Sequence, residues 1–223
     1  MHHTYTQYYR KSFYLIIHLN QSSEVWLFNC NEGTQHSLLK HQIKLSSISK
    51  IFITDLALNS ISGLPGLLST LSLDNRNKTL YIYGPNKLCN YLKFNNKYSQ
   101  TNFSYPVRIL NLEQNYTLFH RLYTIHVISL NQTKQALGYI ITSRQILGKF
   151  DLSNATMFNL NRGPLYGKLK QHNNFITPDG NEIQGKQFSN TYRKGQKIIV
   201  TSNIKQTTLL KELCWTSNNM ITT

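Results

Sequence analysis

The sequence predicts an α/β layered domain, on the evidence of its length, its apolar content and its alternating elements. The chain has 223 residues, of which 40% are hydrophobic. That is enough for one sizeable core and too little for two. Short β-branched and aromatic runs alternate with segments of helical spacing, without an internal repeat. Such alternation is typical of sheets covered by helices, so we expect a single domain over residues 1–223.

The first half of the chain favours a hairpin followed by strand–helix units. Phe13–Leu19 and Glu24–Phe28 are apolar runs separated by the turn-forming residues 20–23. Leu38 and Leu39 mark one side of a helix, and Pro65 is tolerated in the first turn of another. The further elements expected here are a helix over Glu32–Lys44, a strand over Lys50–Thr54, a helix over Gly63–Leu73, a strand over Leu80–Tyr83 and a helix over Asn86–Phe94.

The second half continues the strands but contains a segment of different texture. We expect strands over Val107–Leu110, Tyr123–Leu130, Leu137–Ile141 and Lys197–Thr201. Residues 148–187 are instead rich in Gly, Asn and Lys. This composition predicts an insertion with little core of its own.

Charge and cysteine usage restrict the class of protein. The 24 Lys and Arg residues outnumber the 9 Asp and Glu residues, which gives a formal charge of +15. Such a balance favours a polyanionic partner, with nucleic acid first and an anionic membrane surface second. No apolar run approaches the roughly 20 residues of a membrane span. Three scattered cysteines support neither a zinc knuckle nor a disulfide framework.

Three stretches, in their order and spacing, resemble the ribonuclease Z (tRNase Z) family of the metallo-β-lactamase fold. They are Trp26–Gln35, then Ile51–Thr54 with Ile61–Thr70, then Gly148–Asp151 with Gly163–Lys170 and Asp179-Gly180. The resemblance implies a four-layered αββα metallo-β-lactamase fold, here shortened at the C-terminus. It also implies a phosphodiesterase that removes the 3′ trailer of precursor tRNA with two zinc ions.

The resemblance also indicates where the family's zinc ligands would lie. Its H-x-H-x-D-H cluster falls on residues 55–60, a further histidine falls ahead of Gly138-Tyr139, and the metal-bridging aspartate follows the late buried strand. This sequence has none of those ligands, and the degenerate positions are Asp55, Ala57, Asn59, Ser60, Gln132 and Ser202. Amides, hydroxyls and a methyl group do not replace imidazoles and carboxylates as zinc ligands. We therefore expect no zinc cofactor and no intact catalytic residue.

Residues near these positions could give a different metal site. Asn29 stands where the family has an aspartate beside the ligands. Asp55, Asn59 and Ser60 are oxygen donors that could hold Mg²⁺ through waters, as hard cations prefer. One carboxylate makes this a poor cage. The remaining histidines are scattered and give no substitute cluster.

The tRNA-contacting side of the family pattern survives better. In the family, an arm with a G-P…L-K pattern grips the tRNA elbow. Here residues 148–187 form the corresponding inserted arm, and its expected tRNA-binding residues are Arg162, Gly163, Pro164, Lys168 and Lys170. His172 replaces the glycine that usually follows. Phosphate contacts of this kind give affinity without sequence information. The alternative is a solvated, lysine-rich loop.

These features lead to a ribonuclease Z-like protein of tRNA 3′-end processing that acts as a tRNA-binding or partner subunit without catalysis. Its expected partners are tRNA or precursor tRNA, a second copy of itself or an active ribonuclease Z subunit, and no membrane. Whether it is an enzyme stays open, because an unconventional metal site could still support trailer cleavage. A non-enzymatic remnant is the third alternative. The composition, poor in Ala and rich in Asn and Lys, suggests AT-rich codons, and hence a plastid-encoded stromal protein or a bacterial cytoplasmic one.

Overall fold

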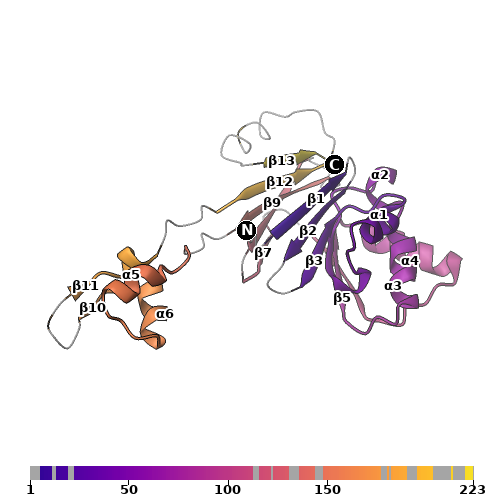
Figure 1. Ribbon diagram of the computed structural model, residues 1–223. Coiled ribbons are helices and arrows are strands. Elements are labelled where there is room, and N and C mark those ends of the chain that lie inside the picture. The colour runs from indigo at the N-terminus through magenta and orange to yellow at the C-terminus, as the bar shows by residue number, and fades with distance from the viewer. Residues whose placement is uncertain are drawn as a thin grey trace. The chain divides into compact units, whose positions relative to one another are not determined.

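The computed structural model divides the chain into two compact units, residues 1–141 with 197–223 and residues 142–196. It describes residues 6–11, 14–19, 23–112, 116–121, 123–130, 136–143, 148–176, 180, 182–189, 195–202, 212 and 219–222. The first unit contains two sheets and a group of helices on one side of them (Figure 1). The second unit is a small helical body with a two-stranded hairpin.

The first sheet has the strand order β1-β2-β3-β4-β5-β6. Its strands are β1 (Thr6–Lys11), β2 (Tyr14–Leu19), β3 (Glu24–Phe28), β4 (Ile48–Phe52), β5 (Leu80–Gly84) and β6 (Val107–Asn111). The first three strands pair antiparallel, and β3 to β6 pair parallel. The parallel strands are joined through α1 (Thr34–Lys40), α2 (Leu58–Ile61), α3 (Leu64–Leu73) and α4 (Leu88–Ser99), as parallel pairing requires crossover connections.

The second sheet has the order β13-β12-β9-β8-β7. Its strands are β7 (Thr117–Phe119), β8 (Tyr123–Ser129), β9 (Leu137–Ser143), β12 (Lys197–Thr201) and β13 (Asn219–Thr222). The strand β12 thus enters the sheet after the chain has passed through the second unit. The insertion leaves the sheet at β9 and returns to it at β12.

Side chains alternate between two cores, because successive residues of a strand point to opposite faces. One core lies between the first sheet and helices α1 to α4, with Ile16, Leu27 and Ile51 from the sheet side. The other core lies between the two sheets and is aromatic. Phe28, Phe52 and Tyr83 stack across neighbouring strands with centroid separations of 4.7 and 4.9 Å. The described part of the first unit therefore supplies three layers: helices, sheet and sheet.

The second unit has a core of its own. Its elements are α5 (Leu152–Met157), α6 (Pro164–Lys170), β10 (Phe175–Ile176), β11 (Glu182–Ile183) and a 3₁₀ turn at Gly185–Phe188. Four residues form the buried centre, namely Ala155, Leu169, Ile183 and Phe188. Asp151 caps α5 by accepting hydrogen bonds from the backbone N–H groups of residues 153 and 154. The insertion thus folds as a small body around few apolar residues.

Some boundaries differ from the sequence-based expectations. The helix α1 ends at Lys40 instead of Lys44, because Gln42 takes a left-handed backbone conformation with φ 57°. The helix α4 extends to Ser99, five residues beyond the expected end. The sequence pattern did not identify β1, β7, β13 or the short helices. The second unit spans residues 142–196, wider than the expected 148–187.

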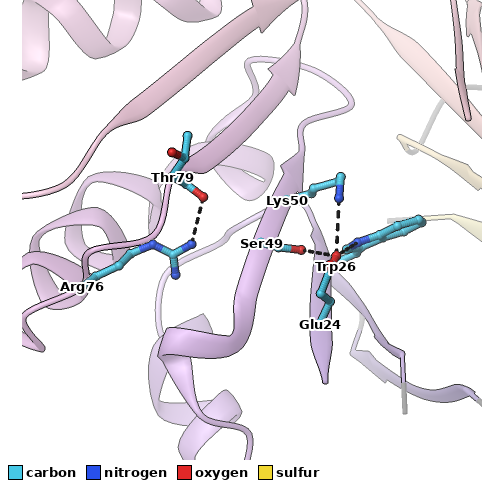
Figure 2. Close-up of polar contacts among 6 residues, drawn as sticks. All are labelled: Glu24, Trp26, Ser49, Lys50, Arg76 and Thr79. Atoms are coloured by element: carbon cyan, nitrogen blue, oxygen red, sulfur yellow. Dashed lines mark hydrogen bonds and ion pairs between the residues drawn. The ribbon is translucent and has the colours of Figure 1, made fainter. Parts of the chain in front are cut away.

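A polar cluster lies where β3 and β4 begin. The Glu24 carboxylate accepts hydrogen bonds from Ser49 Oγ at 2.9 Å and Trp26 Nε1 at 3.4 Å, and it pairs with Lys50 Nζ at 3.4 Å (Figure 2).

Within the described part of the chain, no helix has the length and apolarity needed to cross a membrane.

Gly63, just before α3, gives a direct test of the close packing in the first unit. A Cβ at this position would lie 2.0 Å from the Asn31 carbonyl oxygen, whereas a Cβ at Gly66 would meet only the Gln35 side chain at 4.0 Å. We expect Gly63→Ala to lower the free energy of unfolding by more than about 2 kcal/mol, since backbone must move. Gly66→Ala, the matched control within α3, should be neutral or stabilising by up to about 1 kcal/mol. Urea unfolding of both variants measures this, and equal stabilities would contradict it.

Candidate functional site

The candidate site lies at one edge of the two-sheet core, where β4 and β12 end and β9 begins. Ser143 N–H donates to the Gln196 carbonyl oxygen at 2.8 Å, so the end of β9 lies beside the start of β12. These two neighbouring strands therefore run antiparallel, and Ser202, just after β12, lies near the start of β9. Leu137 N–H, at that start, donates to the Thr54 carbonyl oxygen at 2.7 Å. The topology thus brings residues 54, 137 and 202 to one edge.

Asn29 is held in an unusual conformation at this edge. It follows β3 directly, is fully buried, and has a left-handed backbone with φ 59°, which Asn tolerates better than most residues. Its Oδ1 accepts from Thr54 N–H at 2.8 Å and its Nδ2 donates to Thr54 Oγ1 at 2.9 Å. The amide thus supplies both an acceptor and a donor to one residue. It fixes the beginning of the segment that carries residues 55–60.

Tyr139 of β9 supports the same segment from the second sheet. Its hydroxyl donates to the Ile53 carbonyl oxygen at 2.6 Å, and its completely buried ring makes edge contacts with both Phe28 and Phe52. Complete burial raises the pKa of Tyr139 well above its ordinary value, so the hydroxyl stays protonated and donates. The position of Asn29 was predicted from the sequence, whereas its bonds to Thr54 and the bond from Tyr139 to Ile53 were not. The Gly138-Tyr139 pair within the expected strand Leu137–Ile141 was the sequence signal available for Tyr139.

The degenerate positions after β4 make local hydrogen bonds. Asp55 Oδ1 accepts from Ala57 N–H at 3.0 Å, which closes a short turn. Ala57 and Asn59 are exposed, whereas Ser60 is buried and its carbonyl oxygen accepts from Cys30 N–H at 2.8 Å. These four positions lie together on one loop and on α2. Gln132 lies outside the described residues.

Ser202 completes the described part of the edge. It is 4% exposed, and its Oγ has no hydrogen-bond partner among the residues that the structure describes. A buried hydroxyl without a partner carries a free-energy cost. A small neutral oxygen therefore occupies the position that the resemblance assigns to a metal-bridging carboxylate.

The donors gathered here do not fit a pair of zinc ions. Zinc sites in proteins use thiolates, imidazoles and carboxylates. The positions that the resemblance assigns to ligands offer the single carboxylate of Asp55, with amides, hydroxyls and a methyl group at the others. Across the described ranges, no group of three or more His, Cys, Asp or Glu side chains could hold a metal. Burial raises the pKa of the Cys30 thiol to about 12, so it stays protonated at neutral pH. We derive no reaction step through zinc at this edge.

The expected tRNA-binding residues lie in the second unit, around α6. Gly163 and Pro164 begin the helix, and Lys168 and Lys170 lie in its last turn. These four residues and Arg162 are exposed. Residues 142–196 contain eight basic and three acidic residues. His172, where the family has glycine, adopts a left-handed backbone with φ 65°, and its ring nitrogen hydrogen-bonds to Ser189 Oγ.

Replacing Asn29 tests how the edge is held. Asn29→Ala removes both side-chain bonds to Thr54 and leaves a buried N–H unsatisfied, so we expect a loss of about 2–4 kcal/mol in the free energy of unfolding. Asn29→Gly loses the same bonds but adopts the left-handed conformation freely, so it should be about 1 kcal/mol more stable than Asn29→Ala. Chemical denaturation of both variants measures this difference. Stability equal to that of the unsubstituted chain would show that the edge is held elsewhere.

The sequence around this edge is similar to that of known proteins. A family model described as tRNase Z endonuclease matches residues 15–63, the segment that carries Asn29, Thr54 and the loop after β4. An uncharacterized protein, ycf56, of Porphyra purpurea is 42% identical over 200 residues, which are 90% of this chain and 76% of that protein. A ribonuclease Z of Rippkaea orientalis is 38% identical over 183 residues, 82% of this chain and 58% of the relative.

Solved structures agree with the sequence comparisons. The crystal structure of human tRNase Z, short form, is similar with a TM-score of 0.51 at 29% identity, over 60% of this chain and 59% of that one. The chain spans less than two thirds of the length of these tRNase Z and ribonuclease Z relatives. In sequence and in architecture, this chain belongs to the ribonuclease Z family and has the metallo-β-lactamase fold.

Proposed function

We propose that this chain is a ribonuclease Z-like protein that binds tRNA or precursor tRNA and does not itself cleave it. The observation that carries the proposal is the set of donors at the strand-end edge. Binding of a structural zinc ion involves about 10–16 kcal/mol and depends on deprotonated ligands. The amide of Asn59 and the hydroxyls of Ser60 and Ser202 cannot supply that free energy.

The second unit supports the binding half of the proposal. Its exposed cations around α6 have the chemistry that neutralises phosphates, and its own buried core can present them on a folded body. A protein that retains such a unit without metal ligands can act as a tRNA-binding subunit, in a homodimer or beside an active ribonuclease Z.

Asp55 favours one alternative, an endoribonuclease with an unconventional metal site. Its carboxylate could hold Mg²⁺ through waters, although Oδ1 already accepts a hydrogen bond from Ala57 N–H. Cleavage of precursor tRNA by the purified chain, lost in Asp55→Asn, would select this alternative over the proposed function.

The compartment forms part of the proposal. Two red-algal relatives named ycf56, from Porphyra purpurea and Pyropia yezoensis, are 42% and 40% identical to this chain. They support a plastid-encoded protein of the stroma. Bacterial relatives named ribonuclease Z leave a bacterial cytoplasm as the alternative.

Charge removal in the second unit tests tRNA binding. We expect the triple variant Arg162→Gln, Lys168→Gln, Lys170→Gln to weaken tRNA binding, because each cation that neutralises a phosphate contributes about 0.7–0.9 to the slope of log affinity against log salt. The slope should fall by about 2. A matched control replaces the exposed cations Lys40, Lys44 and Arg121 of the first unit. Fluorescence anisotropy with labelled tRNA at several salt concentrations measures both, and equal losses would assign the binding to overall charge.

Treatment with a chelator tests whether the stability and the tRNA affinity of the chain depend on a bound metal. A protein whose native state binds zinc loses stability when the metal is removed. We expect EDTA treatment to leave both Tm and the Kd for tRNA unchanged. A fall in Tm that zinc alone restores would contradict the proposed loss of the metal site.

A further inference from the structure

The outer face of α4 combines exposed aromatic rings with exposed cations. Leu88 and Leu92 of this helix are buried against the first sheet. Away from these two residues, Phe94 is 59% exposed and Tyr98 is 79% exposed. The helix belongs to the first unit, in the layer that covers the sheet (Figure 1).

The spacing of these residues forms two parallel rows. Phe94 and Tyr98 are four residues apart and therefore adjacent on the helix surface, about 5–6 Å between Cβ atoms. Lys93 and Lys97, both exposed, make a second row with the same spacing. The two rows are neighbours on the helix surface because Phe94 and Lys97 are three residues apart. The outer face of α4 thus presents two aromatic rings next to two lysine side chains.

The surrounding sequence strengthens the positive charge of this face. Between Asp74 and Glu113 the chain contains six basic residues and no acidic one. Five of them are exposed, namely Lys78, Lys87, Lys93, Lys97 and Arg108. The one ion pair between described residues joins Lys50 and Glu24 and involves none of these five. Their charges are therefore available to a ligand.

The sixth basic residue, Arg76, is buried, and no carboxylate among the described residues pairs with it. Its Nε donates to the Lys78 carbonyl oxygen at 2.8 Å, Nη1 donates to that of Ser46 at 3.2 Å, and Nη2 donates to that of Thr79 at 3.3 Å. The last of these contacts is drawn in Figure 2. Carbonyl oxygens satisfy the donors but leave the formal charge in place. Burial lowers the pKa of Arg76 from a very high value, so the group still carries its proton at neutral pH.

We propose that the outer face of α4 binds single-stranded RNA, with bases stacked on Phe94 and Tyr98 and phosphates beside Lys93 and Lys97. Aromatic rings that stack successive bases within a positive groove or surface are the usual means of binding single strands without sequence preference. The complementary charge identifies a polyanion, and the paired rings identify one with exposed π faces. This surface is separate from the tRNA-binding unit and does not rest on the proposed function.

The test uses the full chain and a labelled 12-nucleotide oligouridylate, followed by fluorescence anisotropy. We expect Phe94→Ala with Tyr98→Ala to weaken binding about tenfold or more, because one stacked base contributes roughly 1–3 kcal/mol. Replacement of both by Trp should retain the affinity. The matched control is Tyr116→Ala with Phe119→Ala, a second exposed Tyr–Phe pair near β7, which should leave binding unchanged. All four side chains are exposed, and circular dichroism verifies that the variants fold.

Three outcomes would overturn the proposal. Unchanged affinity in the Phe94, Tyr98 double variant, with a loss in Lys93→Gln and Lys97→Gln, would show a charged surface without stacking. Equal competition by heparin and by oligouridylate would show a site for any polyanion. The Arg162, Lys168, Lys170 triple variant separates this inference from the proposed function, because it should lose tRNA affinity while it retains oligouridylate binding. A chain that binds tRNA but not oligouridylate would contradict the inference alone.

Discussion

The paired hydrogen bonds between the Asn29 amide and Thr54 are the interaction on which the geometry of the site depends. They join the end of β3 to the end of β4, and Leu137 N–H and the Tyr139 hydroxyl tie the same segment to the second sheet. The loop that carries Asp55, Asn59 and Ser60 therefore starts from a fixed point. Every one of these contacts is made by a neutral group. The edge can keep its shape without a cation to organise it.

The same arrangement accounts for the stability of the fold under the proposed loss of the zinc ligands. The two cores lie on either side of the first sheet and consist of apolar side chains. Ala57 and Asn59, two of the positions that the resemblance assigns to zinc ligands, are exposed and belong to neither core. Among the described residues, the Ser202 hydroxyl has no hydrogen-bond partner, and the cost of one such group is small beside the burial of a whole sheet face. Under the proposed function, the fold therefore keeps its stability without a metal centre.

Part of the fold and of the site could be predicted from the sequence. Strands such as Leu80–Tyr83 were confirmed because β-branched and aromatic runs have few other uses. The edge strand β1 and the short β7 were missed, although each pairs with the next strand along the chain. Thr6–Lys11 is largely polar and Thr117–Phe119 has only three residues, so neither makes an apolar run that predicts a strand. The position of residues 55–60 after a buried strand was predictable from the family resemblance. The link from Thr54 to Asn29 and to Leu137 was not, because it depends on backbone geometry that no local pattern encodes.

The basic residues of the chain lie in two different surroundings. Around α6 it lies on a small folded unit beside a Gly-Pro turn, and on α4 it accompanies two exposed rings. The composition alone predicted a polyanionic partner but could not divide the charge between these settings. The exposure of side chains in the structure distinguishes the two settings. On α4, Phe94 and Tyr98 are exposed whereas Leu88 and Leu92 are buried. The two proposals therefore assign two modes of RNA contact to one chain: phosphate contacts around α6, and base stacking with phosphate contacts on α4.

Anomalous X-ray diffraction tests the central claim most directly. Crystals grown with excess zinc and measured on both sides of the zinc absorption edge would show any ion bound near Asn59 and Ser202. We expect no pair of anomalous peaks there, with the Asn29–Thr54 hydrogen bonds intact. Two peaks about 3.5–4 Å apart, the spacing of a two-metal site, would contradict the loss of the metal centre.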